Sequence, residues 1–230
     1  MLRARLLILG TVLIGGSIVH GQGQIQALPD LVIDTPRVQS SVVFQIKNFT
    51  RNDCAWQEGS ILSTGKRTLM RFDVSAANLG GADLSLGDPT LRPDLFTYSP
   101  CHRHYHFNGY ASYELLGQPG NVLVTGRKQA FCLEDFELYS QTAGPAKFTC
   151  GYQGISVGWA DTYGSYLDGQ WLDITGITPG LYRLRVIINP YNVVSPRPPG
   201  YTDAAAAALT ESNYTNNTAI VQVSIPVKIK

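Results

Sequence analysis

Short apolar runs that end at turn-forming residues dominate the chain from residue 30 onward. We expect strands at 41–46, 68–74, 105–116, 122–124, 128–133, 182–188 and 219–225. Breaker clusters lie between them at 80–81, 87–89, 117–121, 179–180 and 196–200. Only the alanine-rich stretch 203–210 favours a short helix, or else a loop. The pattern predicts an all-β, antiparallel sandwich-like domain with long loops and little helix.

The first 21 residues have the pattern of a secretory signal peptide. Arg3 and Arg5 precede an apolar run at 6–19, and small residues at 19–21 provide a cleavage signal. An uncleaved anchor is the alternative, although the run is short for a membrane span. We therefore expect a signal peptide at 1–21 and one domain at 22–230.

Composition and net charge indicate how many domains the chain has and which partners are unsuited to it. The chain has 230 residues, 44% of them apolar and 15% charged, which suits one β-rich domain or at most two small ones. Cleavage of the leader removes two arginines and no acid, so the net charge goes from +1 to −1. A near-neutral mature chain argues against nucleic acid or a membrane surface as partner.

Export changes how the cysteines are interpreted. An even number of cysteines in an oxidising compartment predicts two disulfides, and sequence alone allows three pairings. The four are Cys54, Cys101, Cys132 and Cys150. Triplets for N-glycosylation, a weaker sign of export, begin at Asn48, Asn213 and Asn216.

Three of the four histidines fall within five residues, at His102, His104 and His106. Alternate residues of a strand point to one face, so we expect the three imidazoles to share a face. A three-nitrogen site with open positions suits copper, zinc, iron or nickel. The alternative is a polar, solvated strand face.

Three further motifs follow the histidines. Lys128 precedes a cysteine in the segment 126–135, Tyr163 lies in the Asp-Thr-Tyr-Gly run at 161–164, and acid and amide side chains fill 211–217. Taken singly, each motif is a weak signal. In this order, together with the Gln-Trp-Leu-Asp-Ile-Thr run at 170–175, they resemble the catalytic domain of lysyl oxidases over about residues 30–225.

The resemblance implies an activity and its cofactors. His102, His104 and His106 match the copper(II) ligands, and Lys128 and Tyr163 match the pair joined as lysine tyrosylquinone. Such a secreted copper amine oxidase uses dioxygen to deaminate primary amines, peptidyl lysine foremost. It forms an aldehyde and releases hydrogen peroxide and ammonia.

A general base must remove a proton from the substrate carbon in such a reaction. Asp161, Asp135 and Asp173 are the candidates, and we favour Asp161 because it is near Tyr163 in sequence. A turn-forming role for Asp161 is the alternative.

The resemblance also implies a calcium site and a disulfide pairing. Oxygen ligands suit calcium, although Asn213 stands where the family has an acid. The matching positions are Asp30, Leu31 (by its carbonyl), Glu211, Asn213, Asn216 and Asn217. A polar loop without an ion is the alternative. Cys101 and Cys150 match a family disulfide, which leaves Cys54 with Cys132.

Two other functions remain open at this stage. One is a zinc or iron enzyme that uses the three histidines as a Lewis-acid site without a quinone. The other is an inactive, metal-stabilised extracellular binding module. The sequence does not decide between peptidyl lysine and a small amine as substrate, since loops such as 190–208 would build the pocket.

Overall fold

A computed structural model describes residues 26–126, 131–190 and 209–229. The expected signal peptide, Lys128 and most of the 190–208 loop and of the 203–210 helix lie outside these residues. The described strands are β1 (Leu31–Ile33), β2 (Val43–Phe49), β3 (Gly65–Arg71), β4 (Val74–Asn78), β5 (Leu84–Gly87), β6 (Phe96–Ser99), β7 (His104–Phe107), β8 (Ala111–Leu116), β9 (Val122–Thr125), β10 (Glu137–Leu138), β11 (Gln153–Ile155), β12 (Trp159–Tyr163), β13 (Trp171–Asp173), β14 (Gly180–Ile188) and β15 (Thr218–Ile225).

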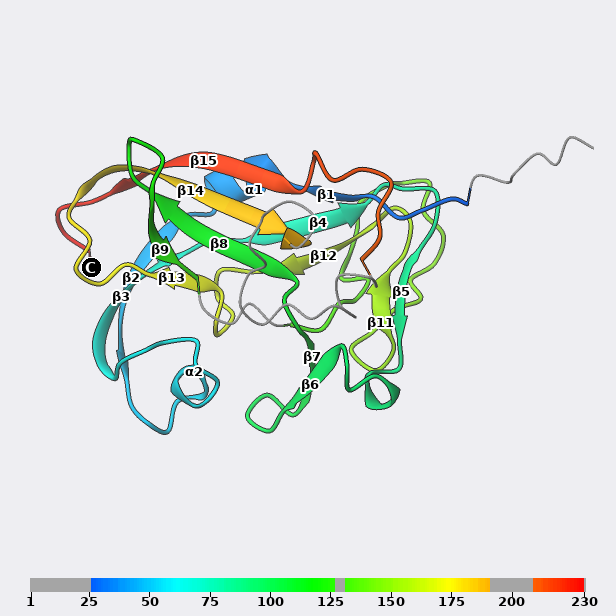
Figure 1. The fold of residues 1–230 in the computed structure, drawn as a ribbon, viewed down its shortest axis with the longest axis horizontal. Coiled ribbons are helices and arrows are strands. Elements are labelled where there is room, and N and C mark those ends of the chain that lie inside the picture. The colour runs from blue at the N-terminus through cyan, green and yellow to red at the C-terminus, as the bar shows by residue number, and fades with distance from the viewer. Residues whose placement is uncertain (1–25, 127–130, 191–208, 230) are drawn as a thin grey trace, which may run out of the picture.

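These strands form small antiparallel sheets around one main core (Figure 1). The two four-stranded sheets have the orders β15-β14-β8-β9 and β1-β4-β12-β10, and a three-stranded sheet has the order β13-β3-β2. Pairs β11-β5 and β6-β7 extend from them. All pairings are antiparallel, which confirms the all-β prediction for the described residues.

Alternating apolar residues explain why β14 and β15 pair at the edge of the core. In β15, every second residue from Ala219 to Ile225 is buried, whereas Ile220, Gln222 and Ser224 face solvent. Each buried valine or isoleucine contributes about 1.5–3 kcal/mol relative to exposure. A one-residue slip would expose this whole face, so the register with β14 is well specified.

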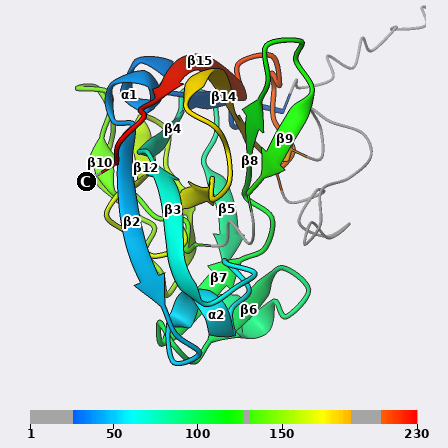
Figure 2. The ribbon, with the colours of Figure 1, turned by 90° about the vertical axis from the view of Figure 1, so that its left-hand side faces the viewer.

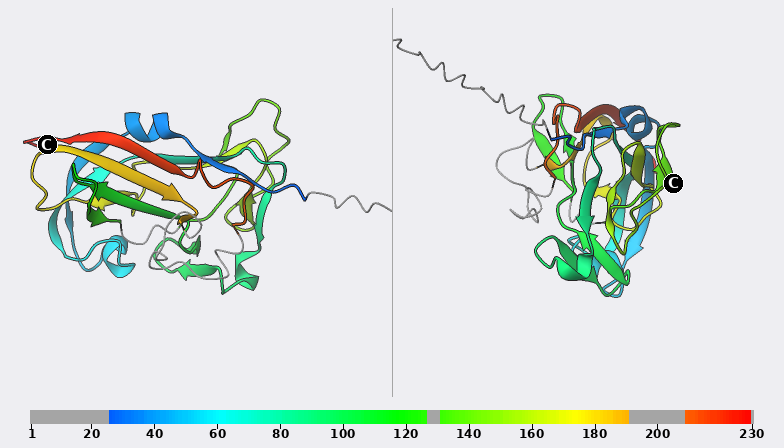
Figure 3. Two further views of the ribbon diagram at one scale, coloured as in Figure 1. Left: turned by 45° about the horizontal axis from the view of Figure 1, so that its top comes forward. Right: turned by 90° about the vertical axis from the view of Figure 1, so that its right-hand side faces the viewer.

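The helices are short and were not predicted. Helix α1 (Thr35–Ser40) begins after Asp34, whose side chain accepts a hydrogen bond from the Arg37 amide, and Pro36 occupies its first turn. It packs beside β15 (Figure 3). Helix α2 is Cys54–Gln57, and a 3-10 helix, η1, is Pro89–Leu91. Within the described ranges, none of these helices has the length and apolar character of a membrane crossing.

The structure divides two of the predicted strands. The stretch 105–116 forms β7 and β8, separated by a turn in which Gly109 has φ 77°. The stretch 68–74 covers the end of β3 and the first residue of β4. At the first break the chain passes to another sheet through Gly109, since glycine adopts a positive φ most readily.

The disulfide pairing inferred from the resemblance is wrong. Cys54 bonds to Cys101 and Cys132 bonds to Cys150, with Cα–Cα distances of 5.7 and 5.2 Å. The first bridge joins the start of helix α2 to the turn that follows β6, which brings Cys54 to the start of the histidine run. Figure 2 shows both segments at the same end of the molecule. The side chain of Gln153 accepts from the Leu133 amide and donates to the Cys150 carbonyl, which holds the second pair together.

Candidate metal centre and active site

The three histidines converge, although only two of them lie in a strand. His104 and His106 are in β7, whereas His102 lies in the preceding turn, where Arg103 has φ 62°. The prediction that all three alternate along one strand is therefore wrong for His102. The turn nevertheless places the His102 ring close to the other two rings. Ring centroids are 5.9 Å apart for His102–His104, 5.3 Å for His102–His106 and 4.8 Å for His104–His106.

The arrangement of nitrogen atoms fits a transition metal. The Nε2 atoms of His104 and His106 lie 3.0 Å apart. The buried Nδ1 of His102 lies 3.3 Å from Oε1 of Glu58, without a hydrogen bond between them. Two ligands at ~2.1 Å from one ion are about 3.0–3.4 Å apart when their angle is between a right angle and tetrahedral. Imidazole-rich sites of this kind suit copper or zinc.

Burial of His104 favours its neutral form. Burial lowers its pKa from the ordinary value of 6.5, and the neighbouring His102 lowers it further. The neutral imidazole is the form that binds metals. Sequence reasoning identified the three histidines but missed Glu58, because nothing in its local sequence connects it to them.

Tyr163 and Asp161 form a buried pair on one face of β12. The Tyr163 hydroxyl donates to the Asp161 carboxylate and also lies 2.5 Å from the Cys132 carbonyl oxygen. Its ring stacks on Phe131, with centroids 4.2 Å apart and planes at 24°. Burial raises the pKa of Tyr163 well above its ordinary value, and the charge of Asp161 raises it further. The phenol is thus held neutral and beside a proton acceptor.

The three candidate bases have different surroundings. Burial raises the pKa of Asp161, which lies within β12 and not in a turn. Asp135 accepts hydrogen bonds from the amide and the hydroxyl of Ser156 and from the amides of Lys147 and Phe148. Its carboxylate therefore holds neighbouring loop segments together. Asp173 is paired with Arg67 and accepts from Thr175. Of the three, only Asp161 contacts Tyr163 in the described structure.

A short backbone connection links the histidines to Tyr163. The amide of Phe107, which follows His106, donates to the carbonyl of Phe131 at 2.7 Å. The ring of Phe131 in turn stacks on Tyr163. Lys128 precedes Phe131 by three positions and lies outside the described residues.

The terminal motif forms a second polar cluster. Buried Glu211 accepts from the Leu31 amide at 2.6 Å and from the Asn217 side chain at 2.8 Å. Asn216 donates to Asp30 at 2.9 Å. Burial raises the pKa of Glu211. Acid, amide and backbone groups from the two ends of the domain therefore meet here.

Two details of this cluster bear on calcium. The side-chain oxygens of Asn216 and Asn217 are buried without hydrogen-bond partners, and such oxygens suit a hard cation. The side-chain oxygen of Asn213, by contrast, accepts from the amide and hydroxyl of Thr215 in a local turn. Leu31 presents its amide to Glu211, whereas the prediction used its carbonyl.

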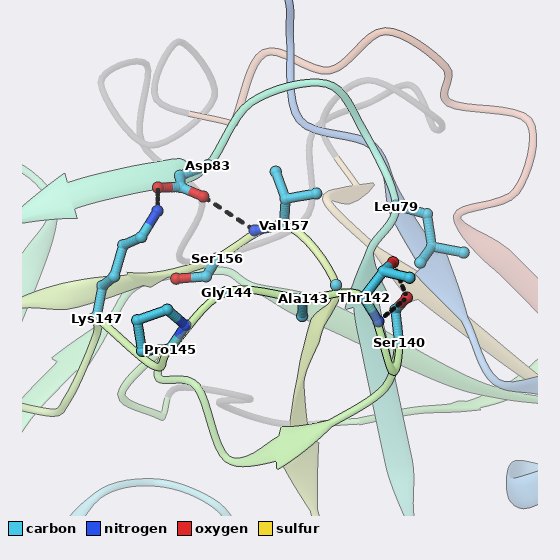
Figure 4. A pocket seen from close by; sticks show the side chains of 11 residues that line it. Leu79, Asp83, Ser140, Thr142, Ala143, Gly144, Pro145, Lys147, Ser156 and Val157 are labelled. Atoms are coloured by element: carbon cyan, nitrogen blue, oxygen red, sulfur yellow. Dashed lines mark hydrogen bonds and ion pairs between the residues drawn. The ribbon is translucent and has the colours of Figure 1, made fainter.

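Of the two described pockets, only one includes a predicted site residue, the candidate base Asp173. The pocket in Figure 4 is bordered by the ion pair of Lys147 and Asp83 and by the loop from Ser140 to Pro145, and it includes no predicted site residue. A second pocket is lined by Trp171, Asp173 and the end of β9, immediately before the segment that carries Lys128.

Comparison with known proteins decides the family. The sequence model of the family described as lysyl oxidase matches residues 29–225, most of the chain. The chain belongs to the lysyl oxidase family. It is 34% identical over 215 residues to lysyl oxidase homolog 2 of Xenopus tropicalis, covering 88% of this chain and 25% of that protein.

Other members of the lysyl oxidase family give similar values. Lysyl oxidase homolog 4 of Homo sapiens is 33% identical over 193 residues, which cover 79% of this chain and 25% of that protein. Lysyl oxidase homolog 3A of Danio rerio is 34% identical over 200 residues, which cover 82% of this chain and 24% of that protein. The chain thus spans about a quarter of the length of these relatives.

Proposed function

We propose that this lysyl oxidase family member is a secreted copper amine oxidase. It oxidatively deaminates primary amines, peptidyl lysine foremost, to an aldehyde, and releases hydrogen peroxide and ammonia. His102, His104 and His106 bind copper(II), and Lys128 and Tyr163 become lysine tyrosylquinone. Family membership and the convergence of the three imidazoles support this proposal.

The observation that carries the proposal is the environment of Tyr163. A phenol that becomes a quinone must lose its proton, and Asp161 accepts the hydrogen bond from that hydroxyl. The ring is buried and stacked on Phe131, which fixes its orientation and excludes water from one face. A tyrosine with only a packing role would not need a buried carboxylate, whose desolvation is costly.

The residues of the chain have distinct roles in this proposal. When bound, copper and the quinone supply oxidation by dioxygen and an electrophilic carbonyl for the substrate amine. Asp161 is placed to take a proton beside the ring of Tyr163. Phe131 holds the ring in place, and its backbone bond to Phe107 fixes the distance to the histidine strand.

Two further assignments belong to the same proposal. The signal peptide at 1–21 directs secretion, which agrees with two disulfides among the described cysteines. The cluster of Asp30, Glu211, Asn216 and Asn217 binds calcium and ties β1 to the segment before β15.

Amine-dependent peroxide release tests the proposed function. Copper-loaded protein should produce peroxide on addition of a lysyl peptide or a diamine, and a carbonyl reagent should block it. Lys128→Ala should abolish turnover and leave copper bound, because the histidines are untouched, whereas the matched control Lys147→Ala should remain active. Turnover that survives Lys128→Ala would favour a Lewis-acid enzyme without a quinone, and a copper-bound protein with no turnover would favour a binding module.

A further inference from the structure

We infer that Glu58 is a fourth protein ligand of the metal centre, which makes the site three imidazoles and one carboxylate. This inference rests on the proposed metal site and deepens it. Glu58 follows α2, on a part of the chain distant in sequence from the histidines, and it lies in none of the motifs that point to metal binding.

A covalent bond brings Glu58 to the histidines. The disulfide Cys54–Cys101 joins the first residue of α2 to the residue immediately before His102. The amide of Glu58 donates to the Cys54 carbonyl at 2.8 Å, so Glu58 follows the bridged cysteine by one helical turn. The carboxylate is therefore anchored at the centre and does not swing freely on the surface.

Ser99 fixes the orientation of this carboxylate. Its hydroxyl donates to Oε1 of Glu58 and accepts from the His102 amide at 3.0 Å. Ser99 is the last residue of β6, directly opposite His104 in the β6–β7 pair. Serine thus links the carboxylate, the His102 backbone and the strand that carries the other two histidines.

Two pairs of atoms in this cluster have the separation of adjacent ligands on one ion. Ligand atoms of Glu58, His102 and His106 lie within 4.8 Å of one another. The 3.3 Å between Glu58 Oε1 and His102 Nδ1 is the spacing of two adjacent ligands of one metal, as is the 3.0 Å between His104 and His106. Since His102 Nδ1 makes no hydrogen bond in the structure, a metal bonded to both atoms explains why it faces a carboxylate.

Charge provides an independent argument. Three neutral imidazoles leave both charges of a copper(II) or zinc ion uncompensated in a partly enclosed site. The Glu58 side chain is only 11% exposed, so its carboxylate lies within the site and not in bulk solvent. As a ligand it would compensate one of these charges.

Copper titration of Glu58→Gln tests this inference. Glutamine preserves the shape and can accept the Ser99 hydrogen bond, but it lacks the charge. We expect copper(II) affinity to fall at least ~10-fold, and the electron paramagnetic resonance spectrum of bound copper to change its parallel hyperfine splitting. Glu114→Gln is the matched control, because Glu114 in β8 pairs with Arg185. This variant should change neither the copper affinity nor the spectrum.

The outcomes separate this inference from the proposed function. Unchanged affinity and an unchanged spectrum in Glu58→Gln would overturn the Glu58 assignment alone. Wild-type protein that binds no copper, or whose copper binding is insensitive to His104→Ala, would overturn the metal site itself. If Glu58→Gln does not fold, Ser99→Ala should shift the copper spectrum, because the hydroxyl that orients the carboxylate is lost, and an unchanged spectrum there would count against the assignment.

Discussion

The hydroxyl of Tyr163 donates a hydrogen bond to the carboxylate of Asp161, two positions earlier on β12. Both side chains are almost fully buried, and burial raises the pKa of each. A strand places alternate residues on one face, so their spacing brings the acceptor directly to the phenol. The residue that we propose becomes the quinone therefore has a buried carboxylate as the hydrogen-bond acceptor of its hydroxyl.

Asp161→Asn should reduce amine turnover about 10²–10⁴-fold, the usual contribution of a general base. The amide preserves the shape of the carboxyl group but cannot take a proton from a phenol or a substrate carbon. Steady-state peroxide release by copper-loaded protein measures the effect. Asp173→Asn is the control, since Asp173 pairs with Arg67 on another sheet. Equal loss in both variants would contradict a special role for Asp161.

The same substitution should make stability respond differently to pH in metal-free protein. A carboxyl whose pKa is raised by folding favours the folded state below the ordinary aspartate pKa of ~3.9, and this advantage is lost as the pH rises through the folded value. Asparagine does not titrate. Relative to wild type, Asp161→Asn should therefore gain stability as the pH rises from ~4 to ~8.

Denaturant unfolding of both proteins across this pH range measures the difference. Asp88→Asn provides the opposite control, because the hydrogen bonds from Thr90 lower the pKa of Asp88. That variant should lose stability relative to wild type as the pH rises. A stability difference for Asp161→Asn that stays constant or falls with pH would show that the buried carboxyl carries no desolvation penalty.

Non-reducing peptide mapping should recover Cys54 linked to Cys101, and Cys132 linked to Cys150. The bridges enclose sequence separations of 47 and 18 residues, and crosslinks of this kind stabilise by about 3–4 kcal/mol through the unfolded chain. The double variant Cys54→Ser with Cys101→Ser should also weaken copper binding, because α2 and Glu58 are released. A recovered Cys101–Cys150 peptide would contradict this structure.

Calcium should raise the melting temperature of the wild-type protein and have no effect on Glu211→Gln. Binding stabilises the folded state by about 2.7 kcal/mol at a free concentration 100-fold above the dissociation constant. Glu211 meets Leu31 and Asn217 at the point where the two ends of the domain join. Glu137→Gln, remote from this cluster, is the control and should keep the response. A calcium-independent wild-type melting temperature would exclude a bound ion.

The sequence predicted the elements whose signals are local. The alternation in β15 and the spacing of His104 and His106 were sufficient to expect a strand and a shared face. Strand β12 was missed, because it is buried on both faces between β4 and β10 and has no alternating pattern. Its pairing with β4 joins segments far apart in the chain, which no local signal reports.

Parts of the candidate metal centre also had no local signal in the sequence. The position of Glu58 and the disulfide partners depend on how α2 meets the turn after β6, a tertiary contact that side-chain spacing does not encode. The turn at Arg103 was also missed, since a positive φ at a non-glycine residue is uncommon. The resemblance to lysyl oxidases supplied the roles of Lys128 and Tyr163, which are weak signals on their own.

Mass analysis of proteolytic peptides from copper-loaded protein tests the central claim most directly. Our account predicts that the peptide containing Tyr163 is covalently joined to the peptide containing Lys128, and that the joined species is missing from Tyr163→Phe and from protein expressed without copper. Two separate, unmodified peptides in copper-replete wild-type protein would contradict the account.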